Sequence, residues 1–174
     1  MKKFILFAAI LFSAVTMVNA QTSNEGTANL TIKLNAVQSI TVSGDVEIDY
    51  TTADDYANGK ESTTFTTLSV VSAGGFAIRV EADDLSNGTS TMAAKNIEVT
   101  AEAIGDATGA TFDANGTLER TTTKQALIES TTGGVNKQYT VKYKGDGGNE
   151  YMKNYNAGGT QTYTTTVTYT IAAN

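Results

Sequence analysis

The side chains that could carry chemistry in this chain are carboxylates and tyrosines, because the chain contains no histidine and no cysteine. The commonest general base, the thiol nucleophile and the usual zinc ligands are therefore missing. Glu98 and Glu102 could suggest the acid pair of a glycosidase, which needs two acids on opposite sides of a cleft. A strand would place both on one face, with no evident cleft between them. We therefore predict that the chain is not an enzyme and has no catalytic residue.

Three acidic segments could supply oxygen ligands to calcium: Asp54–Asp55, Asp83–Asp84 and residues 146–150. None of them has the spacing of an EF-hand loop, and paired acids in loops are usually just solvated. We therefore predict no metal site and no cofactor, while a calcium site in one of these loops stays open.

Four tyrosines, Tyr50, Tyr56, Tyr151 and Tyr155, lie near Asp and Asn residues and could form a platform for carbohydrate. The face of a tyrosine ring stacks on a sugar, while side-chain amides bond the sugar hydroxyls. Tyrosines at sheet edges are more often structural. Glycan binding is therefore kept as an alternative function.

These side chains must be positioned by strands. Threonine accounts for 30 of the 174 residues, and β-branched side chains favour a pleated surface over a helix. Apolar and polar residues alternate along most of the chain, which predicts strands at 28–42, 46–50, 65–72, 76–82, 95–103, 125–130, 138–144 and 162–172. Gly-rich or Asn-Gly turns separate many of them, so we predict an all-β, antiparallel β-sandwich. Residues 121–130 could form either a helix or a strand.

Long amphipathic strands are predicted near both ends of the chain. The apolar face of the first comprises Ala28, Leu30, Ile32 and Leu34. The corresponding face of the last comprises Tyr163, Val167, Tyr169 and Ile171. The first strand is far longer than usual, so we expect it to break near Val37. Either each strand belongs to the sheet of its own domain, or the N-terminal strand, residues 28–36, completes the sheet of a neighbouring subunit.

This layout resembles that of the alternate chaperone–usher pilins of Gram-negative bacteria, which are cysteine-free and Thr-rich. The matching residues are 27–34 (TANLTIKL), as a donor strand, and 163–171, as the alternating final strand. The resemblance implies an immunoglobulin-like sandwich that self-associates or joins other surface subunits, with a periplasmic chaperone as a further partner. Those pilins commonly have a proline after the donor strand, where this chain has Ala36–Val37–Gln38. The chain also resembles a loose group of exported, Thr-rich bacterial sandwich proteins of unassigned function that end in a similar Tyr-Thr-Thr-Thr-Val-Thr-Tyr pattern.

The first 20 residues predict export. Lys2 and Lys3, an apolar run from 4 to 18 and the small residues up to Ala20 fit a cleaved signal peptide, residues 1–20. The mature chain, residues 21–174, is then expected to be a single sandwich domain in the periplasm, at the cell surface or outside the cell. Removing Lys2 and Lys3 lowers the formal net charge from −6 to −8. With no basic cluster and no later apolar run of membrane-spanning length, we expect neither nucleic acid as a partner nor membrane insertion of the mature chain.

The sequence therefore favours a non-enzymatic structural subunit of a bacterial surface fimbria or filament, assembled by strand exchange. The alternative is a self-contained secreted or surface module that binds glycan or cell wall. The two functions differ in whether residues 28–34 pack against their own domain or against a neighbour.

Overall fold

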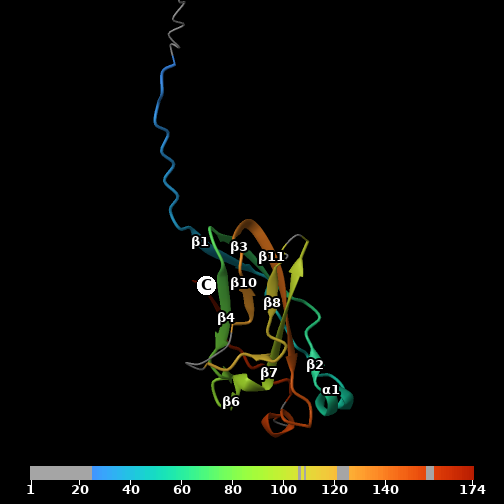
Figure 1. The fold of residues 1–174 in the computed structure, drawn as a ribbon. Coiled ribbons are helices and arrows are strands. Elements are labelled where there is room, and N and C mark those ends of the chain that lie inside the picture. The colour runs from blue at the N-terminus through green and yellow to red at the C-terminus, as the bar shows by residue number, and fades with distance from the viewer. Residues whose placement is uncertain (1–24, 106, 108, 121–125, 156–158) are drawn as a thin grey trace, which may run out of the picture. The chain divides into compact units, whose positions relative to one another are not determined.

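The computed structural model describes residues 25–174 except 106, 108, 121–125 and 156–158 (Figure 1). The predicted signal peptide, residues 1–20, lies outside the described residues. Residues 34–174 form one compact unit, and residues 25–33, which precede it, contain no helix or strand. Within the described ranges, no helix is long and apolar enough to cross a membrane.

Residues 34–174 fold into two main antiparallel sheets, so the predicted all-β sandwich is confirmed (Figure 1). The larger sheet has the order β1 (Gln38–Ser43), β3 (Thr66–Ser72), β11 (Gly134–Gly145), β7 (Ile97–Ile104) and β9 (Gly116–Thr117), and β2 (Lys60–Glu61) also pairs with β11. The smaller sheet has the order β12 (Val167–Ala173), β4 (Phe76–Ala82), β10 (Ile128–Ser130) and β8 (Ala110–Phe112). The short strands β5 (Leu85–Ser86) and β6 (Thr91–Met92) form a separate hairpin.

The core lies between the two main sheets. The central strands contribute fully buried apolar side chains to it, among them Leu68, Val70, Ile78, Val80 and Val141. Along β3 these residues alternate with partly exposed ones such as Thr67 and Ser69. Burying each large apolar side chain contributes roughly 1.5–3 kcal/mol. Because the chain has no cysteine to form a disulfide, this burial and the backbone hydrogen bonds stabilise the sandwich.

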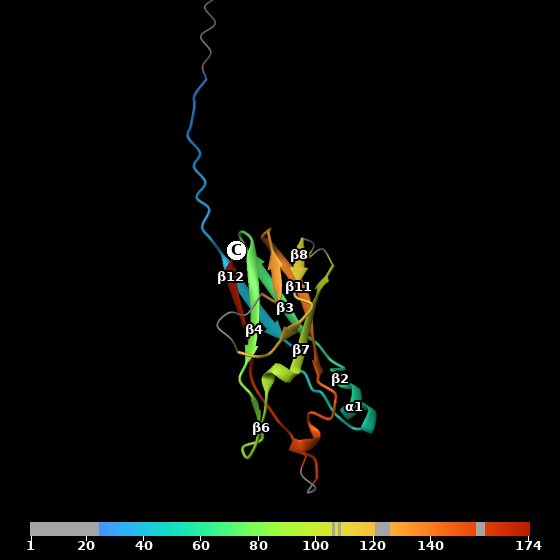
Figure 2. The same cartoon turned by 60° about the horizontal axis from the view of Figure 1, so that its bottom comes forward.

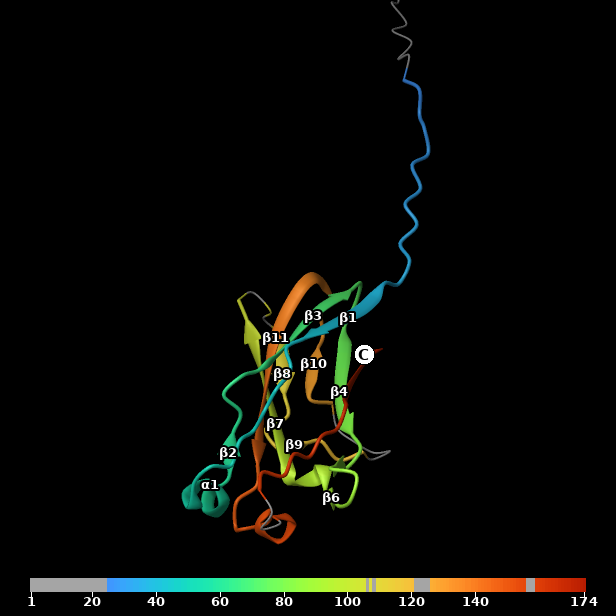
Figure 3. The same cartoon turned by 180° about the vertical axis from the view of Figure 1, so that it is seen from behind.

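The strand register shows which residues share each end of the sandwich. Gln38 of β1 pairs with Ser72 of β3, which also pairs with Gly134 of β11. We call this end, where β1 begins, the arm end, and we call residues 28–36 the arm. At the opposite end Gly145 of β11 pairs with Ile97 of β7, and we call it the far end. Figure 3 shows α1 and the turn after β11 away from the start of β1.

Most predicted strands are present, with shifted bounds. The strands predicted at 65–72, 76–82, 95–103 and 138–144 correspond to β3, β4, β7 and β11. Of the strand predicted at 28–42, only the part from Gln38 onward is present, as β1, and the prediction of a strand over 28–36 is wrong for the single chain. Residues 128–130, part of the segment that could have been a helix, form β10, whereas 121–125 lie outside the described residues. The strand predicted at 162–172 is shorter than expected, because β12 begins at Val167.

The strand predicted at 46–50 is wrong, because residues 44–50 contain no strand. Val46 and Ile48 nevertheless pack partly against the core. Their alternation with polar residues therefore reflects burial of one side of the segment, although the segment pairs with no other described strand. Alternation reports burial directly and strand pairing only indirectly.

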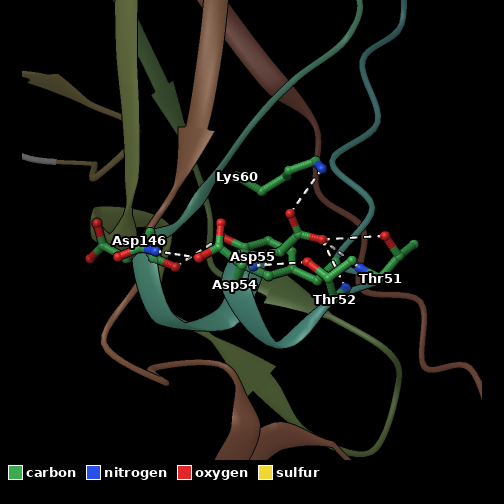
Figure 4. Close-up of polar contacts among 8 residues, drawn as sticks. Thr51, Thr52, Asp54, Asp55, Lys60 and Asp146 are labelled. Atoms are coloured by element: carbon green, nitrogen blue, oxygen red, sulfur yellow. Dashed lines mark hydrogen bonds and ion pairs between the residues drawn. The ribbon is translucent and has the colours of Figure 1, made fainter.

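One helix, α1 (Ala53–Asn58), was not predicted. Thr52 caps it, because its Oγ1 accepts the Asp55 backbone N–H at 3.2 Å while the Asp55 carboxylate accepts the Thr52 N–H at 2.9 Å (Figure 4). Such a reciprocal capping box stabilises the first turn of a helix. The helix ends at Gly59, whose φ is +83° and where a Cβ would lie 2.5 Å from the carbonyl oxygen of Gly145. Both facts require glycine at that position.

Candidate assembly site

The arm carries the predicted assembly residues Ala28, Leu30, Ile32 and Leu34. Residues 25–37 form no strand, although they alternate as a strand does. Leu30, Ile32 and Leu34 are 87%, 73% and 90% exposed. Large apolar side chains are rarely left exposed in a row, because covering each of them is favourable. The arm therefore has the alternating sequence of a β-strand but pairs with none of the described strands.

The edges of the two main sheets meet at β1 and β12. Each is the terminal strand of its sheet: β1 pairs with β3, and β12 pairs with β4. The two strands lie beside each other, with Cα atoms within 8 Å (Figure 2). In the part of the chain that the structure describes, no ladder pairs β1 with β12. Among the described residues, neither β1 nor β12 therefore has a ladder partner on its outer side.

The core is less well covered at this edge than at its centre. Four apolar side chains of the two strands pack partly against the core: Ile40, Val167, Tyr169 and Ile171. Together with Val42, which shares the strand face of Ile40, we call them the β1–β12 edge. None of them is fully buried, and Val42 is 45% exposed. By contrast, Val70 and Val80 of the neighbouring strands are 0% exposed. An additional apolar strand would complete the burial of this edge.

A hydroxyl network joins the two sheets behind this edge. The hydroxyls of Tyr143 in β11 and Tyr169 in β12 form a short hydrogen bond. Tyr143 also bonds Thr66 Oγ1 at 3.3 Å, and Thr66 Oγ1 donates to the carbonyl of Gly44 at 3.2 Å. Burial, with a smaller contribution from Tyr143, raises the pKa of Tyr169 far above its usual value. Tyr169 is therefore neutral over the working pH range and serves as a structural donor or acceptor.

Tyr163 does not lie in the final strand with Val167, Tyr169 and Ile171. Its hydroxyl donates to the carbonyl of Asn154 at 2.9 Å and bonds the Ser90 hydroxyl at 2.6 Å. A single bridge between Thr164 and Ser86 holds the same segment against β5. Tyr163 thus fastens the chain that leads into β12, which corrects the prediction that it belongs to the strand. Its alternation with the later residues is real, but the ladder begins only at Val167.

Three of the four tyrosines predicted as a carbohydrate platform do come together. The ring of Tyr50 lies 5.2 Å from Tyr56 and 5.2 Å from Tyr151, the second pair edge to face. The Tyr50 and Tyr151 hydroxyls donate to backbone carbonyls at 2.9 Å and 2.8 Å. Burial raises the pKa of Tyr151 to about 12. Since these rings pack on one another and Tyr151 is buried, the cluster fastens α1 and the turn after β11 to the far end.

Asp55, one of the acids that could have supplied a ligand to calcium, is occupied by protein donors (Figure 4). Its Oδ1 accepts a hydrogen bond from Lys60 Nζ at 2.9 Å, and its Oδ2 accepts the N–H groups of Thr51 and Thr52, each at 2.9 Å. The Lys60 ammonium and these two N–H groups hold the pKa of Asp55 well below its usual range. Thr51 Oγ1 donates a further hydrogen bond to Oδ2 at 3.2 Å, so the carboxylate caps α1 and is engaged by four protein donors.

Four other acids of the three acidic segments considered for calcium also have protein partners. The pairs are Asp54 with Asn58 Nδ2 (2.7 Å), Asp83 with Arg120 Nη1 (3.3 Å), Asp84 with the Ala94 N–H (2.9 Å) and Glu150 with Asn96 Nδ2 (3.1 Å). Burial raises the pKa of Asp146, the remaining acid. Within the described residues, no group of three or more His, Cys, Asp or Glu side chains is placed to hold a metal ion.

Glu98 and Glu102 lie on one face of β7, opposite Lys144 and Thr140 of β11. Their alternation with the buried Val99 and Ala101 turns both carboxylates to the outer face of the larger sheet. A hollow of about 160 Å³ beside Glu98 is also lined by Glu61 and Lys144. The two acids therefore lie along a strand, and they do not face each other across a space that could hold a sugar.

Sequence reasoning missed the contribution of β1 to the candidate site. Ile40 and Val42 continue the alternation of the arm beyond Val37, and that continuation was the available signal. The partner strand and the hydroxyls behind it come from distant parts of the chain, so spacing alone could not reveal them. No known family model matches this chain, and no curated protein shows significant similarity to it.

Proposed function

We propose that this chain is a structural subunit of a bacterial surface filament or fimbria, exported through a cleaved signal peptide and assembled by strand exchange. The observation that carries the proposal is the arm: its residues alternate like those of a strand, yet they form none and expose Leu30, Ile32 and Leu34. In the assembly, the arm of one copy adds to the sheet of the next as an extra strand.

The β1–β12 edge is the part of the sandwich suited to receive the arm. Its apolar residues are only partly covered, and no described residue forms a ladder with the outer side of either strand. An added strand would bond to one of these edges through its backbone and cover the apolar residues with alternate side chains. Backbone pairing gives the affinity, and the match of alternate side chains gives the specificity.

The energies require both kinds of contact. Full burial of a Leu or Ile side chain contributes roughly 1.5–3 kcal/mol. Association of two molecules costs on the order of 4–15 kcal/mol in lost freedom. Three such side chains contribute roughly 4.5–9 kcal/mol, which covers only the lower part of this range, so the backbone ladder must supply the rest. Polar residues in place of Leu30, Ile32 and Leu34 should consequently abolish assembly even with the ladder intact.

A subunit with an uncovered edge needs a partner before it assembles. Exposed apolar side chains beside an unpaired strand are prone to non-productive association. We therefore include a periplasmic chaperone in the proposal, whose role would be to cover the β1–β12 edge until an arm replaces it.

The test is a pair of matched triple substitutions in the full chain, secreted and measured by size-exclusion chromatography with light scattering. The first variant replaces Leu30, Ile32 and Leu34 with serine. It removes the apolar face of the arm, and we expect it to form only monomers. The control variant replaces Asn29, Thr31 and Lys33 with serine. It changes three residues on the polar face of the arm, and we expect its assemblies to be as large as those of the wild type. Equal assembly by both variants would exclude strand exchange through this face.

A further inference from the structure

We infer that consecutive subunits also touch through their ends, with Val135 and Ile104 at the arm end of one copy packing against Met152 and Tyr155 at the far end of the next. The inference rests on the proposed function, because it takes strand exchange as the first link between subunits. It adds a second interface, formed between two copies of the sandwich itself.

The junction between arm and sandwich is too short to keep two copies apart. The carbonyl of Val37 accepts the Ala73 N–H at 2.8 Å, so Val37 is already fixed to its own sandwich. Leu34, the last predicted assembly residue, precedes it by three positions. An extended chain spans at most about 3.5 Å per residue, so the inserted Leu34 lies within about 10 Å of Val37. The end of one sandwich must therefore adjoin the copy that holds its arm.

Apolar side chains are exposed at the arm end. Val135, which follows Gly134 at the start of β11, is 83% exposed, and Ile104 at the end of β7 is 38% exposed. Both line one open hollow of about 490 Å³, together with Lys137 and Gln138. The pairing of Gln138 with Ile104 places the end of β7 at the same end of the sandwich. A hollow rimmed by exposed apolar side chains suits an apolar side chain from another molecule.

A bulge in β11 accompanies the exposure of Val135. The register of β11 against β3 shifts between Gly134 and Lys137. Within this bulge Asn136 has a φ of +60°, in the left-handed region that residues other than glycine seldom adopt. A bulge re-aims the side chains of its strand. Val135 contributes nothing to the core at this position, so its exposure calls for a role outside the single sandwich.

The far end carries the complementary pair. Met152 begins the short turn η2 (Met152–Asn154), and Tyr155 follows it. Their side chains are 56% and 58% exposed, respectively. The preceding residue, Tyr151, is buried and donates its hydroxyl to the carbonyl of Asn96 at 2.8 Å. Asn96 directly precedes Ile97, which pairs at the far end. The turn is therefore anchored to the sandwich and presents its apolar side chains from a fixed position.

The direction of the arm decides which ends meet. β12 runs toward the arm end, because its Ala173 pairs with Phe76, the first residue of β4. An arm added antiparallel to β12 therefore runs from the arm end to the far end of the acceptor. Antiparallel pairing is the more stable of the two arrangements. β1 runs the opposite way, from Gln38 at the arm end to Ser43, so an arm antiparallel to β1 would bring two arm ends together as a closed pair. Contact between unlike ends repeats without closing, as a filament requires, so the proposed function selects antiparallel pairing with β12.

Engineered disulfides test this contact in the full, exported chain. The native chain has no cysteine, so introduced cysteines are the only thiols. The double variant carries Val135→Cys and Met152→Cys. After assembly it is oxidised and analysed on a non-reducing denaturing gel, where we expect a ladder of bands from many covalently linked subunits. As a control, Ser69→Cys replaces Val135→Cys, since Ser69 lies in the middle of the outer face of the larger sheet, and we expect no ladder.

The outcomes separate the inference from the function on which it rests. Assemblies that light scattering detects but that give no ladder would overturn the contact between ends and leave strand exchange in place. Covalent pairs from Val135→Cys alone would show that like ends meet, which also contradicts the inference. Monomeric wild-type protein would remove the proposed function, and the inference with it. Circular dichroism on each variant confirms that the sandwich has folded.

Discussion

The hydroxyls of Tyr143 and Tyr169 meet between the two sheets and join a central strand of one to the edge strand of the other. Tyr169 also belongs to the β1–β12 edge, where the core is incompletely covered. A polar link at this place holds β12 in position while its outer backbone edge stays unpaired. The link therefore fixes the surface that the proposed function assigns to a neighbouring arm.

Tyr169→Phe tests the energetic role of this link. The substitution removes one hydroxyl but keeps the ring, and Tyr143 retains its bond to Thr66 Oγ1. We expect the free energy of unfolding to fall by about 0.5–1.5 kcal/mol in urea denaturation. Tyr155→Phe is the control, because Tyr155 is mostly exposed, and its effect should stay within about 0.5 kcal/mol. Equal effects of the two substitutions would show that the buried link contributes nothing.

Asp55 predicts a pH dependence of stability. Its pKa is lowered in the folded chain by the Lys60 ammonium and the backbone N–H groups of Thr51 and Thr52. Its ionised form therefore stabilises the fold above the unfolded pKa of about 3.9, and this stabilisation is lost as the pH falls below that value. We expect Asp55→Asn to lower stability at pH 7 and to flatten the loss between pH 5 and pH 2. Urea unfolding across this range measures both effects, and an Asp55→Asn variant with the wild-type pH slope would contradict this role of Asp55.

Substitutions at Gly59 and Gly88 distinguish the cost of a steric clash from the cost of an unfavourable backbone conformation. Their φ angles are +83° and +85°, but a Cβ at Gly59 would lie 2.5 Å from the Gly145 carbonyl oxygen, while nothing lies within 4 Å at Gly88. Gly88→Ala should therefore cost about 1 kcal/mol, from the conformation alone. Gly59→Ala should cost clearly more, because backbone atoms must move. Thermal melts that rank the two substitutions in the opposite order would disprove the clash.

Export predicts the N-terminus of the mature protein. Cleavage after Ala20 leaves Gln21 first, either free or cyclised to pyroglutamate. Intact-mass measurement of protein from a native host should find the chain without residues 1–20. Retention of Met1 in the assembled protein would contradict the predicted signal peptide.

Much of the sandwich could be predicted from alternation, because strands such as β3 and β4 bury every second side chain. The same rule failed at Val46 and Ile48, which are partly buried without a ladder. The helix α1 was missed because Asp54 and Asp55 were considered only as solvated acids or as calcium ligands, although Thr52 and Asp55 have the spacing of a capping box. Alternation shows which face of a strand a residue lies on, but it does not show which other strand lies next to it. The proximity of β1 and β12 could therefore not be predicted.

The candidate site was predictable to a similar degree. The apolar faces of the arm and of β12 are evident in the sequence, and the structure places Val167, Tyr169 and Ile171 at one sheet edge. The hydroxyl bonded to Tyr169 comes from Tyr143, 26 positions away. The exposure of Val135 depends on a bulge, which follows from the register of two strands. Neither relationship has a signature in local spacing.

Strand exchange means that the arm of one copy completes the sheet of another. Removing the arm is the decisive test of this claim. The variant lacking residues 21–34 is compared with the mature chain by size-exclusion chromatography and light scattering, each with and without a synthetic peptide of residues 28–36. Strand exchange predicts that the mature chain forms polymers, that the deletion forms none, and that the peptide binds the deletion variant one to one and raises its melting temperature. A mature chain that stays monomeric with its assembly partners present, or a deletion variant that polymerises as the full chain does, would contradict the claim.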